Sequence, residues 1–170
     1  LFPYTTLFRS QAEAALAVFI CPGFKLGYDS TMNPATLKES RVYFTAGTAT
    51  MDPSFAKCTA QFFTEANAAG VFGRVCIAAA LRSVDHQRAS CLDQANSQAC
   101  GRKNNCTSFA GCPHVNGIAI DLRQNGGVPT PKLIAFAASK GLKLGFVPND
   151  SWHMEPNGQG CSLSGFTNPT

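Results

Sequence analysis

Eight cysteines in a chain of 170 residues restrict this fold more than any other feature of the sequence. In a reducing compartment such a count usually reflects metal or redox chemistry, whereas in a secreted protein it reflects disulfide bonds. The sequence contains no C-x-x-C motif, so a separate structural zinc site built from cysteines is not expected. Eight cysteines allow roughly a hundred complete pairings, and spacing alone does not choose among them.

The positions of the cysteines suggest three groups. Cys58 and Cys76 fall on a predicted helix and a predicted strand, and are either buried thiols or a pair. Cys21 and Cys161 lie near the two ends of the chain, and a bridge between them would join those ends. The remaining four share one polar, loop-rich stretch in which local bridges are an alternative: Cys91, Cys100, Cys106 and Cys112.

Composition narrows the class of protein. Hydrophobic residues make up 45% of the chain and charged residues only 14%, which is below the roughly 25% of an average soluble protein. This balance argues against disorder and against a coiled coil. The net charge of +4 is mild and no lysine or arginine cluster is present, so nucleic-acid binding is not expected. No apolar run reaches the roughly 18 residues that would span a bilayer, and the length indicates one domain.

Helical and strand patterns alternate along the chain. A helix is predicted from Asp52-Pro53 to Gly70, and a second from Thr130-Pro131 to Gly141. Residues 88–111 are polar and predict a long irregular insertion. Strands are predicted at residues 41–46, 75–81, 117–122, 144–147 and 151–155. This order predicts an α+β fold with a small mixed or antiparallel sheet of about four strands packed with helices.

Two of the three histidines lie in informative strings. His114 precedes the predicted strand that carries Asp121, and His153 follows Asp150 by three residues. Two imidazoles and one carboxylate form the ligand set of a catalytic zinc site, and a nearby carboxylate such as Asp150 can act as its general base. Taken singly, each histidine is more simply a hydrogen-bonded imidazole without a metal. His86 belongs to neither string and is expected on the surface.

These strings together resemble a known family. The pattern H-x-x-G-x-A-x-D-L from His114 to Leu122, followed by D-x-W-H-x-E from Asp150 to Glu155, resembles the zinc peptidases of the D-alanyl-D-alanine carboxypeptidase (VanY-like) family. This family belongs to the LAS group, which shares a fold with hedgehog signalling domains. A third segment, Arg82-Ser83 followed by Gln87, resembles the family's R-S…Q segment. Three ordered motifs are more specific than any one of them.

The resemblance implies a role for each matched residue. His114, Asp121 and His153 would hold Zn²⁺. Asp150 takes the position of the general base, where many members of the family carry glutamate. Arg82 would hold a substrate carboxylate or the oxyanion that develops during hydrolysis.

Four further residues surround these positions. Ser83 and Gln87 would bind substrate or support the site, although Gln87 could also be an ordinary loop residue. Glu155 shares a strand face with His153 and either orients that ligand or is solvated at the strand end. Cys112 stands where the family usually has serine, and a free thiolate there would compete for the metal unless a disulfide prevents it.

The function implied by the resemblance is a zinc metallopeptidase that hydrolyses the peptide stem of peptidoglycan. It would be a D-Ala-D-Ala carboxypeptidase or an L-Ala-D-Glu-type endopeptidase. One alternative is a non-catalytic zinc-binding module of the same fold that binds cell wall or a partner protein. Another is a disulfide-rich structural domain with coincidental motifs. The implied setting is secreted, periplasmic or cell-wall associated, in a monomer of bacterial or phage origin.

The predicted domain organisation follows from the extent of the resemblance. Residues 41–158 would form the zinc peptidase domain, with a cysteine-rich insertion at residues 88–112. Residues 1–10 read like a translated sequencing adapter and are treated as a scar. Residues 11–40 would be an N-terminal remnant or extension, and residues 159–170 a C-terminal tail.

Overall fold

The computed structural model describes residues 10–27, 41–46, 49–92, 112–124, 128–148 and 150–161. Their helices and strands follow in this order: α1 (Gln11–Ala17), β1 (Lys25–Gly27), β2 (Arg41–Tyr43), β3 (Thr45–Ala46), β4 (Ala49–Thr50), α2 (Pro53–Ala68), β5 (Cys76–Ala79), α3 (Val84–Leu92), β6 (Ile120–Arg123), α5 (Pro131–Ser139), β7 (Leu142–Leu144) and β8 (His153–Pro156).

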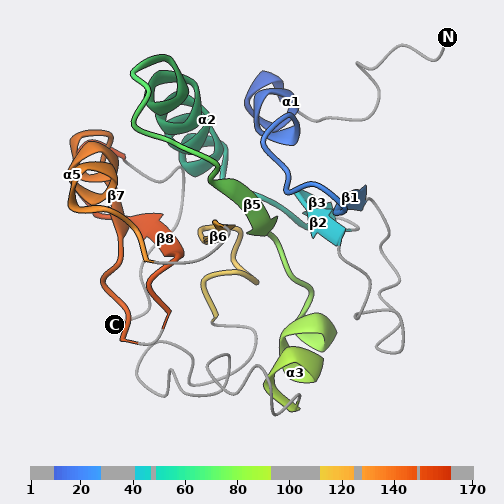
Figure 1. The fold of residues 1–170 in the computed structure, drawn as a ribbon. Coiled ribbons are helices and arrows are strands. Elements are labelled where there is room, and N and C mark those ends of the chain that lie inside the picture. The colour runs from blue at the N-terminus through green and yellow to red at the C-terminus, as the bar shows by residue number, and fades with distance from the viewer. Residues whose placement is uncertain are drawn as a thin grey trace, which may run out of the picture.

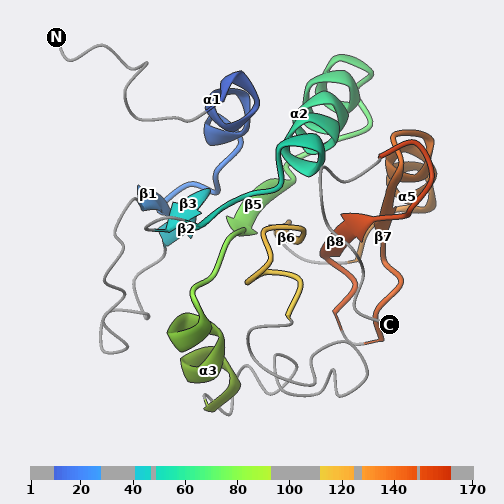
Figure 2. The ribbon, with the colours of Figure 1, turned by 180° about the vertical axis from the view of Figure 1, so that it is seen from behind.

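The centre of the fold is a four-stranded sheet with the order β5-β6-β8-β7, in which all neighbours are antiparallel. Within the described ranges, β1 pairs with β2 in parallel, and β3 pairs with β4 in antiparallel orientation. Helices α1 and α2 lie together at one end of the molecule and α3 lies at the opposite end (Figures 1 and 2). The predicted α+β class with a small sheet is therefore confirmed, while the hedgehog-type fold stays a prediction.

Helix α2 provides much of the core because its sequence combines a strong start with an apolar face. The Asp52 carboxylate accepts the N–H of Phe55 at 3.0 Å, and Pro53 occupies the first turn. Phe62 and Phe63 are fully buried and their rings contact each other and Phe72. The predicted helix is thus confirmed, as is α5, which Thr130 caps through the N–H of Leu133 at 3.2 Å.

One predicted strand ends earlier than expected because a glycine in a left-handed conformation follows it. The strand expected at residues 144–147 is instead β7, which ends at Leu144. Gly145 follows with φ of +74°, a left-handed conformation that does not continue a strand. The expected strand at residues 41–46 also divides, because β2 and β3 pair with different partners.

The irregular insertion was predicted to begin at residue 88, and this boundary is wrong. Helix α3 continues to Leu92, and the Ser83 hydroxyl accepts the N–H of His86 at 3.0 Å at its beginning. The polar composition concealed this helix, because a capped surface helix without an apolar stripe resembles a loop in sequence. Residues 93–111, which hold Cys100 and Cys106, lie outside the described residues.

The disulfide bonds differ from the suggested pairs. Cys21 is bonded to Cys76 and Cys58 to Cys161, with Cα–Cα separations of 4.8 and 6.1 Å. For Cys21 the reason is a long-range backbone contact that spacing does not reveal: its N–H donates to the Ile77 carbonyl at 3.0 Å, which brings Cys21 beside β5. The suggestion that Cys58 and Cys76 pair, or remain thiols, is therefore wrong, as is a Cys21–Cys161 bridge.

The segment before residue 41 contributes to the same packed core. Helix α1 packs against α2, and its buried Leu16 belongs to the main hydrophobic cluster. The Ser10 hydroxyl accepts the N–H of Glu13 at 3.2 Å and caps α1. None of the described helices is long and apolar enough to cross a membrane.

The Cys58–Cys161 bond closes a long loop, so we expect its removal to destabilise the protein. The bond spans 103 residues, and cross-links of this kind typically contribute about 2–4 kcal/mol by restricting the unfolded chain. A Cys58→Ala/Cys161→Ala variant should show this loss in chemical denaturation. A non-reducing digest that yields a peptide linking Cys21 to Cys161 would contradict the connectivity.

Candidate metal centre

A tight turn holds His114 at the edge of the sheet. In this turn the N–H of Ile118 donates to Pro113 at 3.0 Å, and the N–H of Arg82 donates to His114 at 3.2 Å. Gly117 has φ of +69°, and a Cβ at this position would lie only 2.6 Å from the Thr50 carbonyl oxygen. The glycine of the H-x-x-G string is therefore required by close backbone packing.

The sheet register brings the other two residues together. Asp121 on β6 lies directly opposite His153 on β8, and Ile120 lies opposite Met154. Successive residues of a strand point to opposite faces, so Met154 is fully buried in the core while His153 faces the site. Trp152, which precedes β8, packs against the same core.

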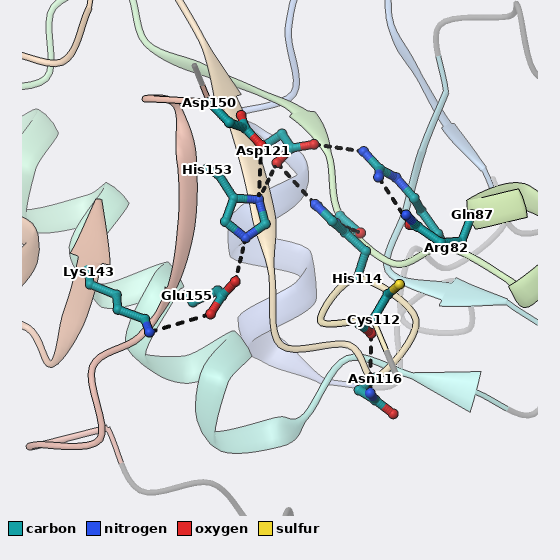
Figure 3. A network of polar contacts seen from close by, with 11 residues as sticks. Arg82, Gln87, Cys112, His114, Asn116, Asp121, Lys143, Asp150, His153 and Glu155 are labelled. Carbon is teal, nitrogen blue, oxygen red and sulfur yellow. Dashed lines mark hydrogen bonds and ion pairs between the residues drawn. The ribbon is translucent and has the colours of Figure 1, made fainter. Parts of the chain in front are cut away.

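One oxygen of Asp121 is the meeting point of both imidazoles. His114 Nε2 lies 3.0 Å from Asp121 Oδ1, and His153 Nδ1 lies 2.8 Å from the same oxygen (Figure 3). The candidate ligand atoms of the three residues all lie within 4.8 Å of one another. Both histidines are buried, with 5% and 2% of their surface exposed.

In each imidazole ring one nitrogen points away from Asp121, and the partner of this outer nitrogen indicates where the ring proton lies. His114 Nδ1 lies 2.6 Å from the Ala80 carbonyl oxygen, which can only accept a hydrogen bond. His153 Nε2 lies 2.7 Å from a carboxylate oxygen of Glu155. These contacts assign the protons to the outer nitrogens. In the neutral rings, the lone pairs of His114 Nε2 and His153 Nδ1 therefore face Asp121.

The electrostatics of the site keep His114 and Asp121 deprotonated near neutral pH. Burial is the largest cause that lowers the pKa of His114 to about 4; the charges of Arg82 and His153 act in the same direction, and the charge and hydrogen bond of Asp121 oppose them. Burial alone would raise the pKa of Asp121. His114, His153 and Arg82 together outweigh it and hold that pKa well below its usual value. A neutral imidazole and an ionised carboxylate are the states that bind a metal.

The three residues fit a zinc ion. Two imidazole nitrogens and a carboxylate oxygen converge at about 3 Å, and a cation among them would be bound by all three. Zinc with nitrogen and oxygen ligands at about 2.0–2.1 Å requires ligand atoms a little over 3 Å apart in tetrahedral geometry. Two histidines and one carboxylate also leave a fourth position for water or substrate.

Arg82 and Gln87 hold the other side of Asp121. Arg82 Nη2 donates to Asp121 Oδ2 at 2.7 Å, and Arg82 Nη1 donates to Gln87 Oε1 at 3.2 Å. Gln87 is 3% exposed and lies on α3, so it is a buried helical residue and not a loop residue. The contact with Arg82 occupies Oδ2 of Asp121 and leaves Oδ1 directed toward the two histidines. Ser83 lies nearby in the sequence, where its hydroxyl caps α3.

Asp150 lies beside the three candidate ligands but does not belong to the group that could hold the metal. Its Oδ2 is 3.9 Å from His153 Nδ1, and its side chain is 32% exposed. The N–H of His153 donates to the Asp150 carbonyl at 3.1 Å, which ties the two residues together through the backbone. This carboxylate is therefore both close to the candidate metal position and open to solvent.

Glu155 connects His153 to a residue that the sequence did not indicate. Glu155 is 6% exposed, which excludes a solvated carboxylate at the strand end, and its Oε2 lies 3.6 Å from Lys143 Nζ. Lys143 on β7 lies opposite Glu155 in the register of the sheet. A line of contacts thus runs from Lys143 through Glu155 and His153 to Asp121 (Figure 3).

Cys112 is disulfide-bonded. It is therefore not a free thiolate that could compete for a metal. Its carbonyl accepts the backbone N–H of Asn116 at 3.0 Å and the side-chain amide at 3.2 Å. The bonded cysteine thus helps to shape the turn that carries His114.

The expectation that His86 lies on the surface is wrong. Its side chain is half-buried on α3 and its ring packs edge-on against Tyr43, with centroids 6.2 Å apart. Nδ1 is buried and has no hydrogen-bond partner among the described residues. Burial lowers the pKa of His86 to about 4, with smaller contributions from the charges of Arg82 and His114. The sequence around an isolated histidine does not show which face of its helix packs against the rest of the protein.

Comparisons with known proteins give a limited result. No protein-family model matches this chain, and no curated protein matches it. Among solved structures, a similar chain is a variant of the vancomycin-resistance D,D-pentapeptidase VanY from a VanB-type resistance cassette, in complex with Zn(II). The two are 17% identical, with a TM-score of 0.42, over 64% of this chain and 73% of that chain. The assignment of the site therefore rests on the residues of this chain.

The contact between Glu155 and His153 predicts an effect on metal affinity. Carboxylates that hold a ligating histidine typically contribute 10- to 100-fold to affinity, so we expect Glu155→Gln to weaken zinc binding by about that factor. Competition titration with a chromophoric chelator measures this. His114→Ala should lose stoichiometric zinc in elemental analysis. Unchanged affinity in Glu155→Gln would rule out this supporting role.

The lowered pKa of His86 predicts a pH-dependent stability. Between pH 6.5 and 4 the unfolded state binds a proton at this residue and the folded state does not, so stability decreases as the pH falls through this range. The loss should reach up to about 3 kcal/mol. Urea denaturation of the wild type and of His86→Gln should show a steeper decrease in the wild type. Parallel pH profiles would contradict the assignment.

Proposed function

We propose that this protein is a zinc-dependent peptidase that hydrolyses the peptide stem of peptidoglycan. One observation carries the proposal: two imidazole nitrogens and one carboxylate oxygen converge in a buried site, with the carboxylate of Asp150 beside them. Metal-assisted hydrolysis needs these parts, namely a ligand set with an open position and a nearby general base. The three ordered motifs from Arg82 to Glu155 support the substrate class through their resemblance to the D-alanyl-D-alanine carboxypeptidases.

Each residue has a part in this reaction. His114, Asp121 and His153 would hold a zinc ion, which would supply Lewis-acid chemistry, namely polarisation of the scissile carbonyl and activation of water near neutral pH. Asp150 accepts a proton from the attacking water and returns it to the leaving amine. Its distance from His153 and its exposure of 32% suit a group that must reach solvent and substrate.

Arg82 has two tasks in this proposal. Its contact with Asp121 Oδ2 keeps Oδ1 directed toward the histidines, and Gln87 fixes the guanidinium plane. A guanidinium has five N–H groups, so donors remain for a substrate carboxylate or for the developing oxyanion. Arg82→Lys should therefore lower both zinc affinity and turnover, because a lysine does not bridge two acceptors with the same geometry.

The disulfide bonds support the proposed setting. Cys21–Cys76 and Cys58–Cys161 are bonded, and structural disulfides persist in oxidising compartments. A secreted, periplasmic or cell-wall associated protein would encounter peptidoglycan there. The described part of the chain does not choose between a carboxypeptidase that removes a terminal D-Ala and an endopeptidase that cuts within the stem.

Digestion of purified peptidoglycan, with mass analysis of the released fragments, tests this function. We expect wild-type protein to release defined stem peptides, and a chelator to abolish this until zinc is restored. Asp150→Asn should keep stoichiometric zinc and lose at least about 100-fold in turnover, because general base catalysis typically contributes this much. Hydrolysis retained by Asp150→Asn would disprove its role as the base. Zinc binding without hydrolysis by the wild type would favour a non-catalytic module.

A further inference from the structure

Lys143 contacts the outer end of the candidate metal centre and has no part in the reaction described above. It lies on β7 directly opposite Glu155 on β8, and side chains paired in this way have Cβ atoms about 5 Å apart. Lys143 Nζ lies 3.6 Å from Glu155 Oε2, while Glu155 Oε1 lies 2.7 Å from His153 Nε2. The Glu155 carboxylate thus joins an ammonium group to a proposed zinc ligand (Figure 3).

The Lys143 ammonium is itself held between two groups. Its Nζ lies 4.4 Å from the ring centroid of Phe146, within the range of a cation–π contact. The ring and the Glu155 carboxylate together restrict a side chain that has many rotamers when it is solvated. The ammonium group therefore has a defined place beside Glu155.

The burial of Glu155 distinguishes this contact from an ordinary surface ion pair. A pair of fully exposed side chains typically changes an equilibrium by about fivefold or less. The side chain of Lys143 is 41% exposed, but that of Glu155 is only 9% exposed, so little water competes for its carboxylate. A contact that fixes one oxygen of this carboxylate therefore also directs the other oxygen toward His153.

We propose that Lys143 is a positioning residue that strengthens zinc binding by holding Glu155 Oε1 on His153. The charge of Lys143 acts in two opposite ways. A positive charge near the metal position by itself disfavours a cation there. Through Glu155, however, the same group keeps the His153 ring directed at the metal position. The second effect is the larger one, because the negative carboxylate lies between the ammonium and His153. This inference rests on the zinc centre of the proposed function and is independent of the bond that is cut.

The zinc affinity of the purified full-length protein, measured by competition with a chromophoric chelator, tests the proposal without a substrate. We expect Lys143→Met to weaken zinc binding by about threefold to tenfold, which is less than the effect of losing the Glu155 carboxylate. Lys143→Arg keeps a cation opposite Glu155 and should bind zinc within about twofold of the wild type. An unchanged or higher affinity in Lys143→Met would overturn the inference.

A double variant shows whether Lys143 acts through Glu155. In the Glu155→Gln background there is no carboxylate to hold, so Lys143→Met should not weaken zinc binding further. Any change there should be an increase, because a positive charge has been removed. A further decrease in this background would mean that Lys143 acts by another route, and would contradict the proposal.

Lys140 provides a matched control. Its ammonium also pairs with a carboxylate, that of Glu65, and also lies over an aromatic ring, 5.4 Å from the centroid of Phe136. Lys140→Met therefore removes the same kind of contacts away from the candidate metal centre, and should leave zinc affinity unchanged. An equal loss of affinity in Lys140→Met would assign the effect to general stability and overturn the inference.

The wild type separates this inference from the proposed function. A wild type that binds zinc, with the expected pattern among the variants, but releases no stem peptide from peptidoglycan would overturn the peptidase function and leave the role of Lys143 in place. Cleavage of peptidoglycan together with unchanged zinc affinity in Lys143→Met would do the reverse. A wild type that binds no zinc would overturn both.

Discussion

The convergence of two imidazole nitrogens on Oδ1 of Asp121 is the interaction on which the rest of the candidate site depends. It joins the turn that carries His114 and the adjacent strand β6 to β8, whose His153 is 32 residues from Asp121. Each of the three residues also has a hydrogen-bond partner on the side away from this centre: His114 contacts Ala80, His153 contacts Glu155, and Asp121 contacts Arg82. These contacts orient the two imidazole rings, so that one nitrogen of each ring faces the candidate metal position.

Paired strands and buried residues hold this centre in place. The register of β6 and β8 places Asp121 opposite His153, and the buried Met154 anchors the same strand in the core. The disulfide-bonded Cys112 and the packing of Gly117 against Thr50 shape the turn before β6. Asp150, by contrast, is partly exposed. Ligands held on buried elements and an exposed carboxylate beside them are the division expected of a site that admits a substrate.

The sequence predicted the parts that depend on local patterns. The helix after Asp52 has a cap, a proline and an apolar face within 16 residues, so its existence is readable without tertiary information. The three candidate ligands were recognised through ordered motifs, and their proximity is consistent with that recognition. The predictions that failed concern long-range pairing or burial. The partner of Cys21 depends on a backbone contact with Ile77, and the burial of His86 depends on packing against Tyr43.

The sequence by itself determined the residue types of the candidate site, their order along the chain and the class of fold, because capping signals, apolar periodicity and motif spacing are local properties. Tertiary structure alone decided which atoms of those residues face one another. The outward contacts of His114 and His153 with Ala80 and Glu155 select the nitrogens that face Asp121, and Lys143 and Phe146 enter the site only through the pairing of β7 with β8 and the turn after Leu144. Except for Glu155, which strand alternation already places on the face of His153, these contacts join residues whose separation in sequence carries no signal, so only the folded chain reveals them.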